Sequence, residues 1–389
     1  MGWNRSAFRA PRSAFEKGGP MEKRVWTFMV YIAGDNNLDP AALTDIGEMA
    51  KVGSSKDLNV VVQLDRARDR KTRRLYITKG GGYAKDCVEA FDETNTGDPA
   101  VLEAFILWAM ERYPADRYAL VIWNHGGGWW DEGARRARRN IAYDDSSGGD
   151  SLNNQELQEV LANVAQIRGK RIDVLGMDAC LMAMLEVAYQ LRDWVQITVG
   201  SEETEPFDGW PYDRVLEVLV KRPRIGAPRL GREIVKAYIK SYQGKGEDVT
   251  QSAFNLHALG DVVWNLDALS GELIADMGIR QVREAVAVAR YYSPSFFDGE
   301  YLDLYRFVQV LKDRCDREGI HARAGELLKG LKPGNQRVIL YRRHLGKRLR
   351  YTHGMSIYFP AGKINPRYRD LDFFRDCRWG EFLGKYLKG

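Results

Sequence analysis

Two segments of the chain place reactive side chains directly after an apolar run. The first run, residues 118–124, leads into His125 and three glycines, and the second, residues 171–177, leads into Asp178 and Cys180. A cysteine thiolate is a strong nucleophile, but a thiol of ordinary pKa is mostly protonated at neutral pH. A neighbouring imidazole can remove that proton and later return it to a leaving group. The two segments therefore predict nucleophilic catalysis, with cysteine as nucleophile and histidine as general base.

The predicted sheet explains how the two residues could meet. Both runs are nearly continuous and β-prone, which is typical of strands in a parallel sheet, and the carboxyl ends of parallel strands share one edge. We therefore expect His125 and Cys180, 55 residues apart in the sequence, to meet at that edge. A helix predicted over residues 180–191 would place its positive end at Cys180 and lower the pKa of the thiol. The N–H groups of Gly126 and Cys180 could then stabilise an oxyanion.

Each residue alone has a plainer interpretation. A lone cysteine among apolar neighbours is usually a small buried side chain, and a lone histidine is usually structural. The joint position of the two after predicted strands favours catalysis. His353 precedes a predicted strand instead of following one, which makes it a weaker candidate for the base. The remaining cysteines have no comparable histidine, and we expect them to be structural: Cys87, Cys315 and Cys377.

The elements that must position these residues alternate along the first 250 residues, as in βαβ units. Strands are predicted over residues 25–33, 58–65, 73–78, 118–124, 171–177 and 195–200, and helices over 98–113, 153–167, 180–191 and 230–242. Further helices are predicted around 260–276, 280–291 and 301–317, and late strands over 337–341 and 354–359. We expect an α/β fold with a mostly parallel central sheet and flanking helices. Its expected parts are a loose leader (1–22), a main domain (23–250) and a smaller α+β region packed on it (251–389).

The composition excludes several classes of protein. The 389 residues include 58 basic and 53 acidic side chains, for a net charge of +5, and 44% are hydrophobic, which argues against wholesale disorder. Four scattered cysteines exclude a disulfide scaffold and form no CxxC metal pair. The apolar runs are too short to span a membrane, and the first twenty residues lack the apolar stretch of a secretion signal. We expect a cytoplasmic protein with no membrane partner.

Several short motifs between residues 25 and 360 are jointly specific: Tyr31–Leu38, Asn124–Trp129, Asp178–Met182, Ser201–Pro206 with Gly209–Tyr212, and Gly354–Pro360. Their types and order resemble the clostripain family of cysteine peptidases, which shares a structural clan with caspases and gingipains. The resemblance implies a caspase-like α/β sandwich. It also implies a dyad of Cys180 as nucleophile and His125 as base, with no obligatory third member.

The resemblance further implies cleavage of peptides or proteins after Arg or Lys. The acidic residue two positions before the nucleophile is Asp178, and a carboxylate at the floor of a pocket can pair bidentately with a guanidinium. An N-cap of the helix predicted after it is an equally good interpretation of Asp178. Asp208 is a secondary candidate for lining the same pocket, as are three acidic residues before it: Glu202, Glu203 and Glu205.

The resemblance also implies possible self-processing, because several members of the family mature by cutting their own loop after the histidine strand. The matching segment, residues 132–140, is rich in arginine, and the bond between Arg139 and Asn140 is the first candidate for processing. An exposed basic loop explains the same composition. Some relatives need calcium, but no EF-hand spacing occurs here. From the sequence we therefore expect no metal site and no cofactor.

A basic C-terminal region supports a different hypothesis. Residues 335–389 contain thirteen basic and four acidic side chains, with the densest cluster in residues 342–350. A catalytically inactive protein of the same fold could use this region to bind nucleic acid or an acidic partner. No nucleic-acid-binding motif accompanies the charge, so a solvated loop between two strands is the favoured interpretation and a nucleic-acid partner is not expected.

Overall fold

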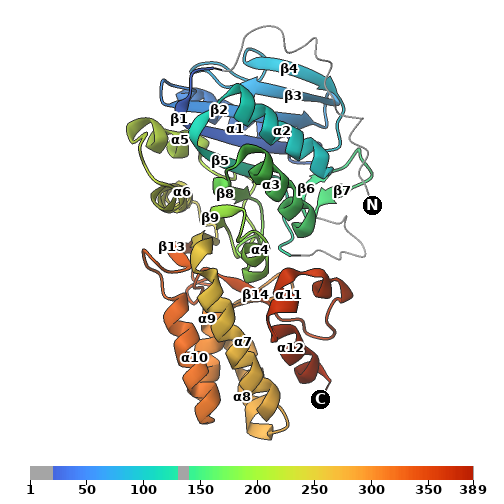
Figure 1. The fold of residues 1–389 in the computed structure, drawn as a ribbon, viewed down its shortest axis with the longest axis vertical. Coiled ribbons are helices and arrows are strands. Elements are labelled where there is room, and N and C mark those ends of the chain that lie inside the picture. The colour runs from blue at the N-terminus through green and yellow to red at the C-terminus, as the bar shows by residue number, and fades with distance from the viewer. Residues whose placement is uncertain (1–20, 130–139, 389) are drawn as a thin grey trace. The chain divides into compact units, whose positions relative to one another are not determined.

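The computed structural model describes residues 21–129 and 140–388. The chain forms two compact units, whose helices and strands are labelled in Figure 1. Unit 1 consists of Met1–Ala179 with Phe207–Gly226, and unit 2 consists of Cys180–Pro206 with Ala227–Gly389. The chain thus crosses from one unit to the other after Ala179, Pro206 and Gly226, and all of these crossings fall before residue 250.

Unit 1 contains a sheet whose strands follow the order β8-β5-β1-β2-β3-β4. The strands β8, β5, β1 and β2 are parallel, β3 is antiparallel to β2, and β4 is antiparallel to β3. Because β4 therefore runs in the direction of β1, the carboxyl ends of β1, β2, β4, β5 and β8 share an edge, here called the carboxyl edge. The bounds are β1 (Arg24–Gly34), β2 (Leu58–Arg66), β3 (Lys71–Tyr76), β4 (Cys87–Asp92), β5 (Ala115–Trp123) and β8 (Ile172–Asp178).

The apolar runs of the sequence are the buried central strands of this sheet. Every residue of β2 is buried, and so is β1 from Trp26 onward. Strands covered on both faces need continuous hydrophobic sequence instead of alternation. The mostly parallel α/β class is confirmed. The structure also contains the four strands predicted over 25–33, 58–65, 118–124 and 171–177, with ends within two residues of the prediction. The exception is the start of β5, which lies three residues earlier than expected.

The helices of unit 1 begin at residues suited to cap them. Asp98 accepts a hydrogen bond from the N–H of Ala100 (2.8 Å), and Asn153 and Glu156 form a capping box. In the described residues, α1 packs on α5 and α2 packs on α3. A short hairpin, β6 with β7, precedes α3. The bounds are α1 (Asp39–Val52), α2 (Pro99–Arg112), α3 (Asn154–Arg168), α5 (Tyr212–Lys221), β6 (Ile141–Asp144) and β7 (Asp150–Leu152).

Unit 2 combines short antiparallel strands with helices. Its strands pair in the orders β13-β10-β9 and β11-β12-β14, with bounds β9 (Val195–Gly200), β10 (Val249–Asn255), β11 (Ser295–Phe296), β12 (Tyr301–Asp303), β13 (Ile339–Leu345) and β14 (Ser356–Tyr358). The helices are α4 (Leu185–Gln190), α6 (Ala227–Tyr242), α7 (Leu259–Asp276), α8 (Arg280–Tyr292), α9 (Leu304–Arg314), α10 (Glu318–Leu331), α11 (Asp372–Asp376) and α12 (Trp379–Leu387). Aromatic side chains such as Phe359, Trp379 and Phe382 pack edge to face in its core.

Two sequence predictions for unit 2 are wrong. The helix predicted over 180–191 begins only at Leu185, because residues 180–184 form a turn and an extended segment. The densest basic run was interpreted as a loop, but Arg342, Arg343 and His344 lie in strand β13. Among the described residues, no helix is both long and apolar enough to cross a bilayer.

Candidate active site

His125 stands at the carboxyl edge of unit 1, two residues after β5 ends. The strand end is anchored by Asn124, whose side-chain amide donates to the carbonyl oxygens of Tyr143 (2.9 Å) and Ala33. The imidazole is half-buried, and its Nε2 lies 2.8 Å from Oδ1 of Asn37 in the turn after β1. An amide oxygen can only accept, so this contact assigns the proton to Nε2 and makes Nδ1 the basic nitrogen.

Asp178 ends the neighbouring strand and lies opposite Trp123 in the β5–β8 register. Its side chain is 5% exposed, and its Oδ2 accepts hydrogen bonds from the Tyr212 hydroxyl (2.8 Å) and from the N–H of Trp210 (3.3 Å). Gly209 has a φ of +54°, and a Cβ there would lie 3.1 Å from Oδ1 of Asp178. The positive φ and the close approach to the carboxylate both favour glycine at this position.

The N-cap interpretation of Asp178 is wrong. The nearest following helix, α4, begins at Leu185, and its N-cap position is occupied by Met184. The acidic side chain is instead held in place by donors from residues 210–212. These donors satisfy part of the charge and leave the carboxylate in a fixed orientation, which is what recognition of a cationic side chain requires.

A further buried acid, Asp45, lies near enough to Asp178 to feel its charge and was not predicted from the sequence. Asp45 in α1 accepts a hydrogen bond from Nε1 of Trp123 (2.7 Å). Burial, and then the charge of Asp178, raise the pKa of Asp45 to about 9, so this carboxyl is neutral at physiological pH. The sequence offered no signal for it, because α1 itself was not predicted.

Cys180 occupies a turn of unit 2 that continues directly from the end of β8. Leu181 has a φ of +66°, an uncommon conformation for a residue with a side chain, and its N–H donates to the carbonyl of Glu203 (3.2 Å). The N–H of Glu205 points at the thiol, with a distance of 3.3 Å from nitrogen to Sγ. Sγ also lies 3.9 Å from the carbonyl oxygen of Glu205, to which the thiol can donate. The contribution that was expected from a helix dipole is absent, because no helix begins at this turn.

The acidic run after β9 has structural partners within unit 2. Glu202 is fully buried and accepts a hydrogen bond from the N–H of Gly354 (2.8 Å); burial and the nearby charge of Asp303 raise its pKa well above the usual range. Glu203 forms an ion pair with Arg348. The side chain of Glu205 accepts from the Gln251 amide (3.1 Å). None of these contacts points to a role in binding substrate.

Four further sequence predictions concern Asp208, the N–H groups of Gly126 and Cys180, and the processing bond. Asp208 is an exposed residue of unit 1. Gly126 lies in a β-bridge opposite Ile141, and its predicted oxyanion role stays a prediction, as does that of the Cys180 N–H. Of the predicted processing bond, Arg139 lies outside the described residues, whereas the carbonyl of Asn140 accepts from the N–H of Gly127 (3.1 Å).

The other thiols differ from Cys180 in their surroundings. Cys315 and Cys377 are buried, and burial raises the pKa of Cys377 to about 12. Burial also raises the pKa of the half-buried Cys87. The thiols of Cys87 and Cys377 are therefore held in the unreactive, protonated form at neutral pH. His353, the weaker candidate for the base, stacks on Tyr305 and contacts Asp303 within unit 2.

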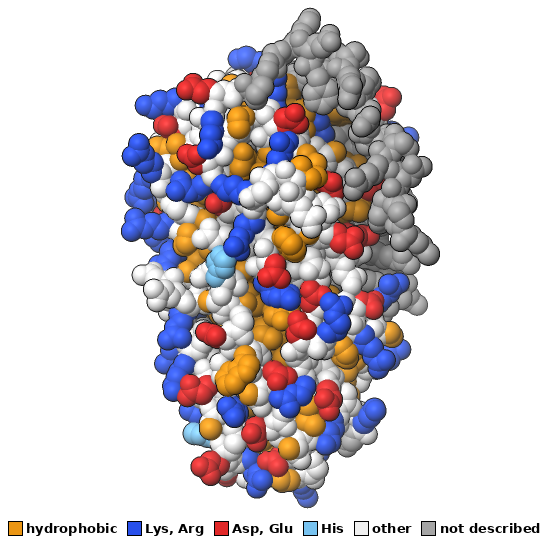
Figure 2. Space-filling model, viewed as in Figure 1, with side chains coloured by type: hydrophobic (Ala, Val, Ile, Leu, Met, Phe, Trp, Pro, Cys, Tyr) orange, Lys and Arg blue, Asp and Glu red, His pale blue; other side chains and the backbone are white. Residues whose placement is uncertain are grey.

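The basic cluster near the C-terminus is partly neutralised within unit 2. Arg342 donates to the carbonyl of Thr352 (2.7 Å), and Arg348 pairs with both Glu203 and Asp248. On the face drawn in Figure 2, Lys and Arg side chains are interspersed with Asp and Glu side chains. These internal contacts weaken the argument for a nucleic-acid partner.

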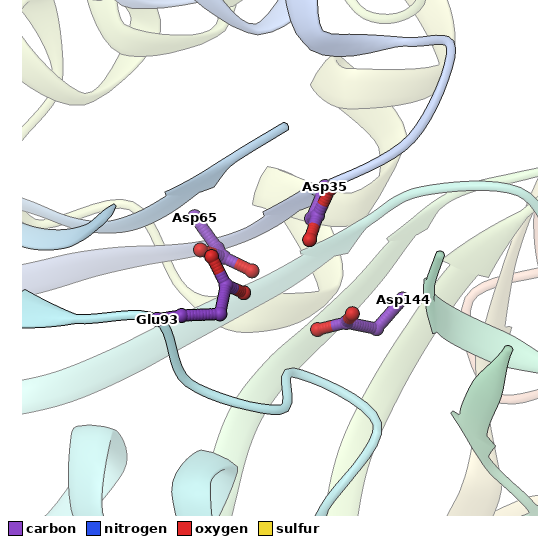
Figure 3. Close-up of side chains that lie close together, drawn as sticks. All are labelled: Asp35, Asp65, Glu93 and Asp144. Atoms are coloured by element: carbon purple, nitrogen blue, oxygen red, sulfur yellow. The ribbon is translucent and has the colours of Figure 1, made fainter. Parts of the chain in front are cut away.

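A separate group of acids could hold a metal ion. Asp35, Asp65, Glu93 and Asp144 lie in unit 1, and one carboxylate oxygen from each lies within 4.8 Å of the others. Figure 3 shows the four carboxylates turned toward one another. The absence of EF-hand spacing led us to expect no metal site from the sequence, and these four acids come from separate segments of the chain.

Comparison with known proteins identifies relatives of the whole fold. The profile of the clostripain family matches residues 30–385. Clostripain from Hathewaya histolytica is 33% identical over 223 residues, which cover 49% of this chain and 41% of that protein, so the chain spans about two fifths of its length.

Solved structures agree in fold. A secreted cysteine protease from Bacteroides thetaiotaomicron, determined with an irreversible peptide inhibitor, matches with a TM-score of 0.69 at 22% identity, over 92% of this chain and 99% of that one. An inactive zymogen protease from Parabacteroides distasonis matches with a TM-score of 0.68 at 19% identity, with the same coverage. At these identities the likeness establishes a shared caspase-like α/β fold.

Proposed function

Because this chain belongs to the clostripain family of cysteine peptidases, we propose that it is an endopeptidase that cleaves peptide bonds after arginine or lysine. The observation that carries the proposal is the register of β5 and β8. Trp123 and Asp178 are paired neighbours in these parallel strands, and each is followed two residues later by a reactive side chain, His125 and Cys180 respectively. This register supports the proposal that His125 acts as the base and Cys180 as the nucleophile, because each follows the end of one of two adjacent strands.

In the proposed reaction, Nδ1 of His125 accepts the proton of the Cys180 thiol, and the sulfur attacks the carbonyl carbon of the scissile bond. The negative charge on the carbonyl oxygen is stabilised by backbone N–H groups, for which Gly126 and Cys180 are the candidates. When the tetrahedral intermediate collapses, the imidazolium gives its proton to the departing amine and a thioester remains. Water, activated by the same imidazole, then hydrolyses the thioester and regenerates the thiol.

The contact of His125 with Asn37 suits this sequence of proton transfers. An imidazole whose Nε2–H donates to Oδ1 of Asn37 keeps Nδ1 as its basic atom throughout the cycle. The carboxamide holds the ring in one orientation without adding a charge. Asn37 is thus proposed as a positioning residue in place of the acidic third member found in other hydrolytic triads.

Selectivity for a basic side chain is assigned to Asp178. Its carboxylate is oriented by hydrogen bonds from Tyr212 and Trp210, and it can pair with a guanidinium or an ammonium. The neutral carboxyl of Asp45 lies near it and adds no charge to the pocket at physiological pH. A charge at Asp178 alone would select basic residues at the position before the cut.

Arginyl and lysyl amide reporters test the activity directly. We expect turnover by the purified chain, and a loss of at least about 10³-fold in Cys180→Ala. Cys87→Ala, which removes a thiol from outside the proposed site, is the matched control and should retain activity. Equal turnover by Cys180→Ala and the parent chain would reject the proposal.

Self-processing in the 132–140 segment is proposed as a separate property, with Arg139–Asn140 as the first candidate bond. The segment is rich in the residue that such an enzyme would cleave after. Intact-mass measurement after incubation should show two fragments for the parent chain and one uncut chain for Cys180→Ala. A fully active preparation that stays uncut would show that processing is not needed.

A further inference from the structure

The segment that follows β9, residues 201–205, continues beyond the last paired residue of that strand. Gly200 ends β9 and pairs with Ser252 of β10. Because the two strands are antiparallel and β10 begins at Val249, Thr250 lies opposite the residues that follow Gly200. A buried N–H group that has no partner in a strand must be bonded in another way.

The side chain of Thr250 supplies these bonds. Its Oγ1 accepts from the N–H of Glu202 (2.9 Å) and from the N–H of Glu203 (3.1 Å), and lies 2.8 Å from Oγ of Ser201. A hydroxyl has one proton and two acceptor lone pairs. Because both lone pairs of Oγ1 are used, the Thr250 proton is donated to Ser201, whose Oγ also accepts from the N–H of Glu203 (3.2 Å). Both hydroxyls are buried and act as one unit.

The carbonyl groups of the same segment hold the turn of the nucleophile. The carbonyl of Glu203 accepts from the N–H of Leu181 (3.2 Å), and that of Ser201 accepts from the N–H of Ala183 (2.8 Å). Leu181 has a φ of +66°, a conformation that a residue with a side chain keeps only where its surroundings enforce it. The segment therefore connects the hydroxyl of Thr250 to the turn.

The far end of the segment is held by the next residue of β10. The side-chain amide of Gln251 donates to Oε1 of Glu205 (3.1 Å). The N–H of Glu205 in turn lies 3.3 Å from Sγ of Cys180. Consecutive residues of β10, Thr250 and Gln251, thus contact both ends of the segment against which the thiol lies.

We propose that Thr250, paired with Ser201, is a positioning residue that fixes the nucleophile Cys180. Its hydroxyl acts through the backbone of residues 201–203, whose carbonyl groups hold the residues that follow Cys180. A displacement of a reacting atom by about 1 Å can lower a rate by about 10²-fold. The inference rests on the proposed function, because only a nucleophilic cysteine needs such exact placement.

A positioning role and a purely structural role of this hydroxyl differ in their kinetics. A hydroxyl that served folding alone would lower Tm when removed and leave the kcat of the folded chain unchanged. A positioning hydroxyl lowers kcat and leaves KM nearly unchanged, because the selectivity assigned to Asp178 in unit 1 does not depend on it.

Thr250→Val removes the hydroxyl and keeps the shape of the side chain. We expect kcat on arginyl reporters to decrease about 10–10²-fold and KM to change by less than about threefold. Thr250→Ser keeps the hydroxyl and should recover most of kcat. An unchanged kcat in folded Thr250→Val, or an equal loss in Thr250→Ser, would overturn the proposal.

Thr198 provides the matched control within unit 2. It lies in β9, is as buried as Thr250, and its Oγ1 has no hydrogen-bond partner among the described residues. Thr198→Val should therefore keep kcat within about twofold of the parent. A loss equal to that of Thr250→Val would trace the effect to a general disturbance of the unit and reject the positioning role.

Ser201→Ala tests the pairing of the two hydroxyls. The N–H of Glu203 keeps Thr250 as an acceptor in this variant, so kcat should decrease only about threefold. Because the hydroxyls form one unit, the double variant should lose little more than Thr250→Val alone, and additive losses would contradict the pairing. If Thr250→Val does not fold, Ser201→Ala decides, and an unchanged kcat there would overturn the proposal.

Hydrogen exchange tests the same contacts without a substrate. In Thr250→Val, amides within residues 180–184 and 201–206 should exchange at least about tenfold faster than in the parent, whereas Thr198→Val should exchange like the parent. Unchanged exchange in Thr250→Val would overturn the proposal. A parent chain that cleaves no reporter, while exchange changes as expected, would reject the proposed function and leave these hydrogen bonds standing.

Discussion

Both units bury carboxylates, but they surround them differently. In unit 2, Glu186 is fully buried and accepts hydrogen bonds from the N–H of Tyr358 (2.9 Å) and the hydroxyl of Tyr368 (2.8 Å). Oε2 of Glu186 has no hydrogen-bond partner among the described residues, and the same holds for buried oxygens of Asp35, Asp65 and Glu93 in unit 1. The difference is that the acids of unit 1 lie close together, in a cluster of four carboxylates at the carboxyl edge. In the same unit, Oδ2 of Asp178 accepts hydrogen bonds from Tyr212 and Trp210.

The difference separates structural acids from functional ones. A buried acid such as Glu186 joins one segment to another through donors and can hold a proton of its own, so it contributes to architecture. We propose Asp178, which is oriented by Tyr212 and lies close to Gly209, as the group that binds a positively charged side chain of the substrate. Burial alone is therefore a weak indicator of function, and the direction of the carboxylate oxygens is the stronger one.

The largest difference between the acids of the two units is expected in their effect on peptidase activity. Asp178→Asn should lower kcat/KM on arginyl and lysyl reporters by about 10²–10³-fold, because the ion pair with the substrate is lost while the bond from Tyr212 can persist. Glu186→Gln, the matched change in unit 2, should alter kcat/KM by less than about threefold. Comparable losses in both variants would erase the distinction between the two units.

The next difference is expected in how the buried acid of unit 2, Glu186, makes the free energy of unfolding depend on pH. The pKa of Glu186 is raised from 4.5 to about 7, mainly by burial, so the folded state holds its proton more tightly than the unfolded state. The contribution of Glu186 to the free energy of unfolding is fully present below pH 4.5. It decreases by up to about 3 kcal/mol as the pH rises to 7. Urea unfolding of Glu186→Gln should lack this slope, and equal slopes in both chains would contradict the assignment.

A smaller effect is expected at the positioning residue. Asn37→Ala should reduce kcat about tenfold with little change in KM, because the ring orientation is lost but the substrate pocket is intact. Asn37→Asp keeps an acceptor for Nε2 of His125 and should recover most of the rate. Asn95→Ala removes a carboxamide from elsewhere in unit 1 and serves as the control. An equal loss in Asn37→Asp would point to a structural role instead.

The smallest effect on activity is expected at Asp45. With a pKa of about 9 this carboxyl is already neutral at pH 7, so Asp45→Asn should change kcat/KM by less than about threefold. The folded pKa lies above that of the unfolded chain, so the parent loses stability as the pH rises toward 9, and the variant should have the higher Tm at neutral pH. A large loss of activity would instead give Asp45 a direct role in binding substrate.

Much of unit 1 was predictable from local sequence. The runs at 25–33, 58–65, 118–124 and 171–177 are continuous and apolar because their strands are covered on both faces. The rule that parallel strands share their carboxyl ends then relates His125 to the end of β8 without any coordinates. The family motifs identify the same two segments and the same order.

Two local features were predicted wrongly from the sequence, the helix over 180–191 and the loop at the basic run. In a segment that is buried on all sides, the sequence pattern does not show where a helix begins. Residues 180–191 are apolar almost throughout, and this pattern does not distinguish the turn at 180–184 from the helix that follows. The basic residues at 342–344 predict an exposed loop, yet they lie in β13, where Arg342 and its neighbours find partners on unit 2. Long charged side chains can reach such partners from a strand.

The sequence by itself determined the apolar strands, the reactive residues that follow them and the family to which the chain belongs, because each of these depends on residues close together along the chain. Only the tertiary structure brought Asp45 near Asp178, Asn37 to His125, and four acids from segments 109 residues apart into one cluster. The direction of strand β4 decides that cluster, and strand direction is set by pairing between distant segments.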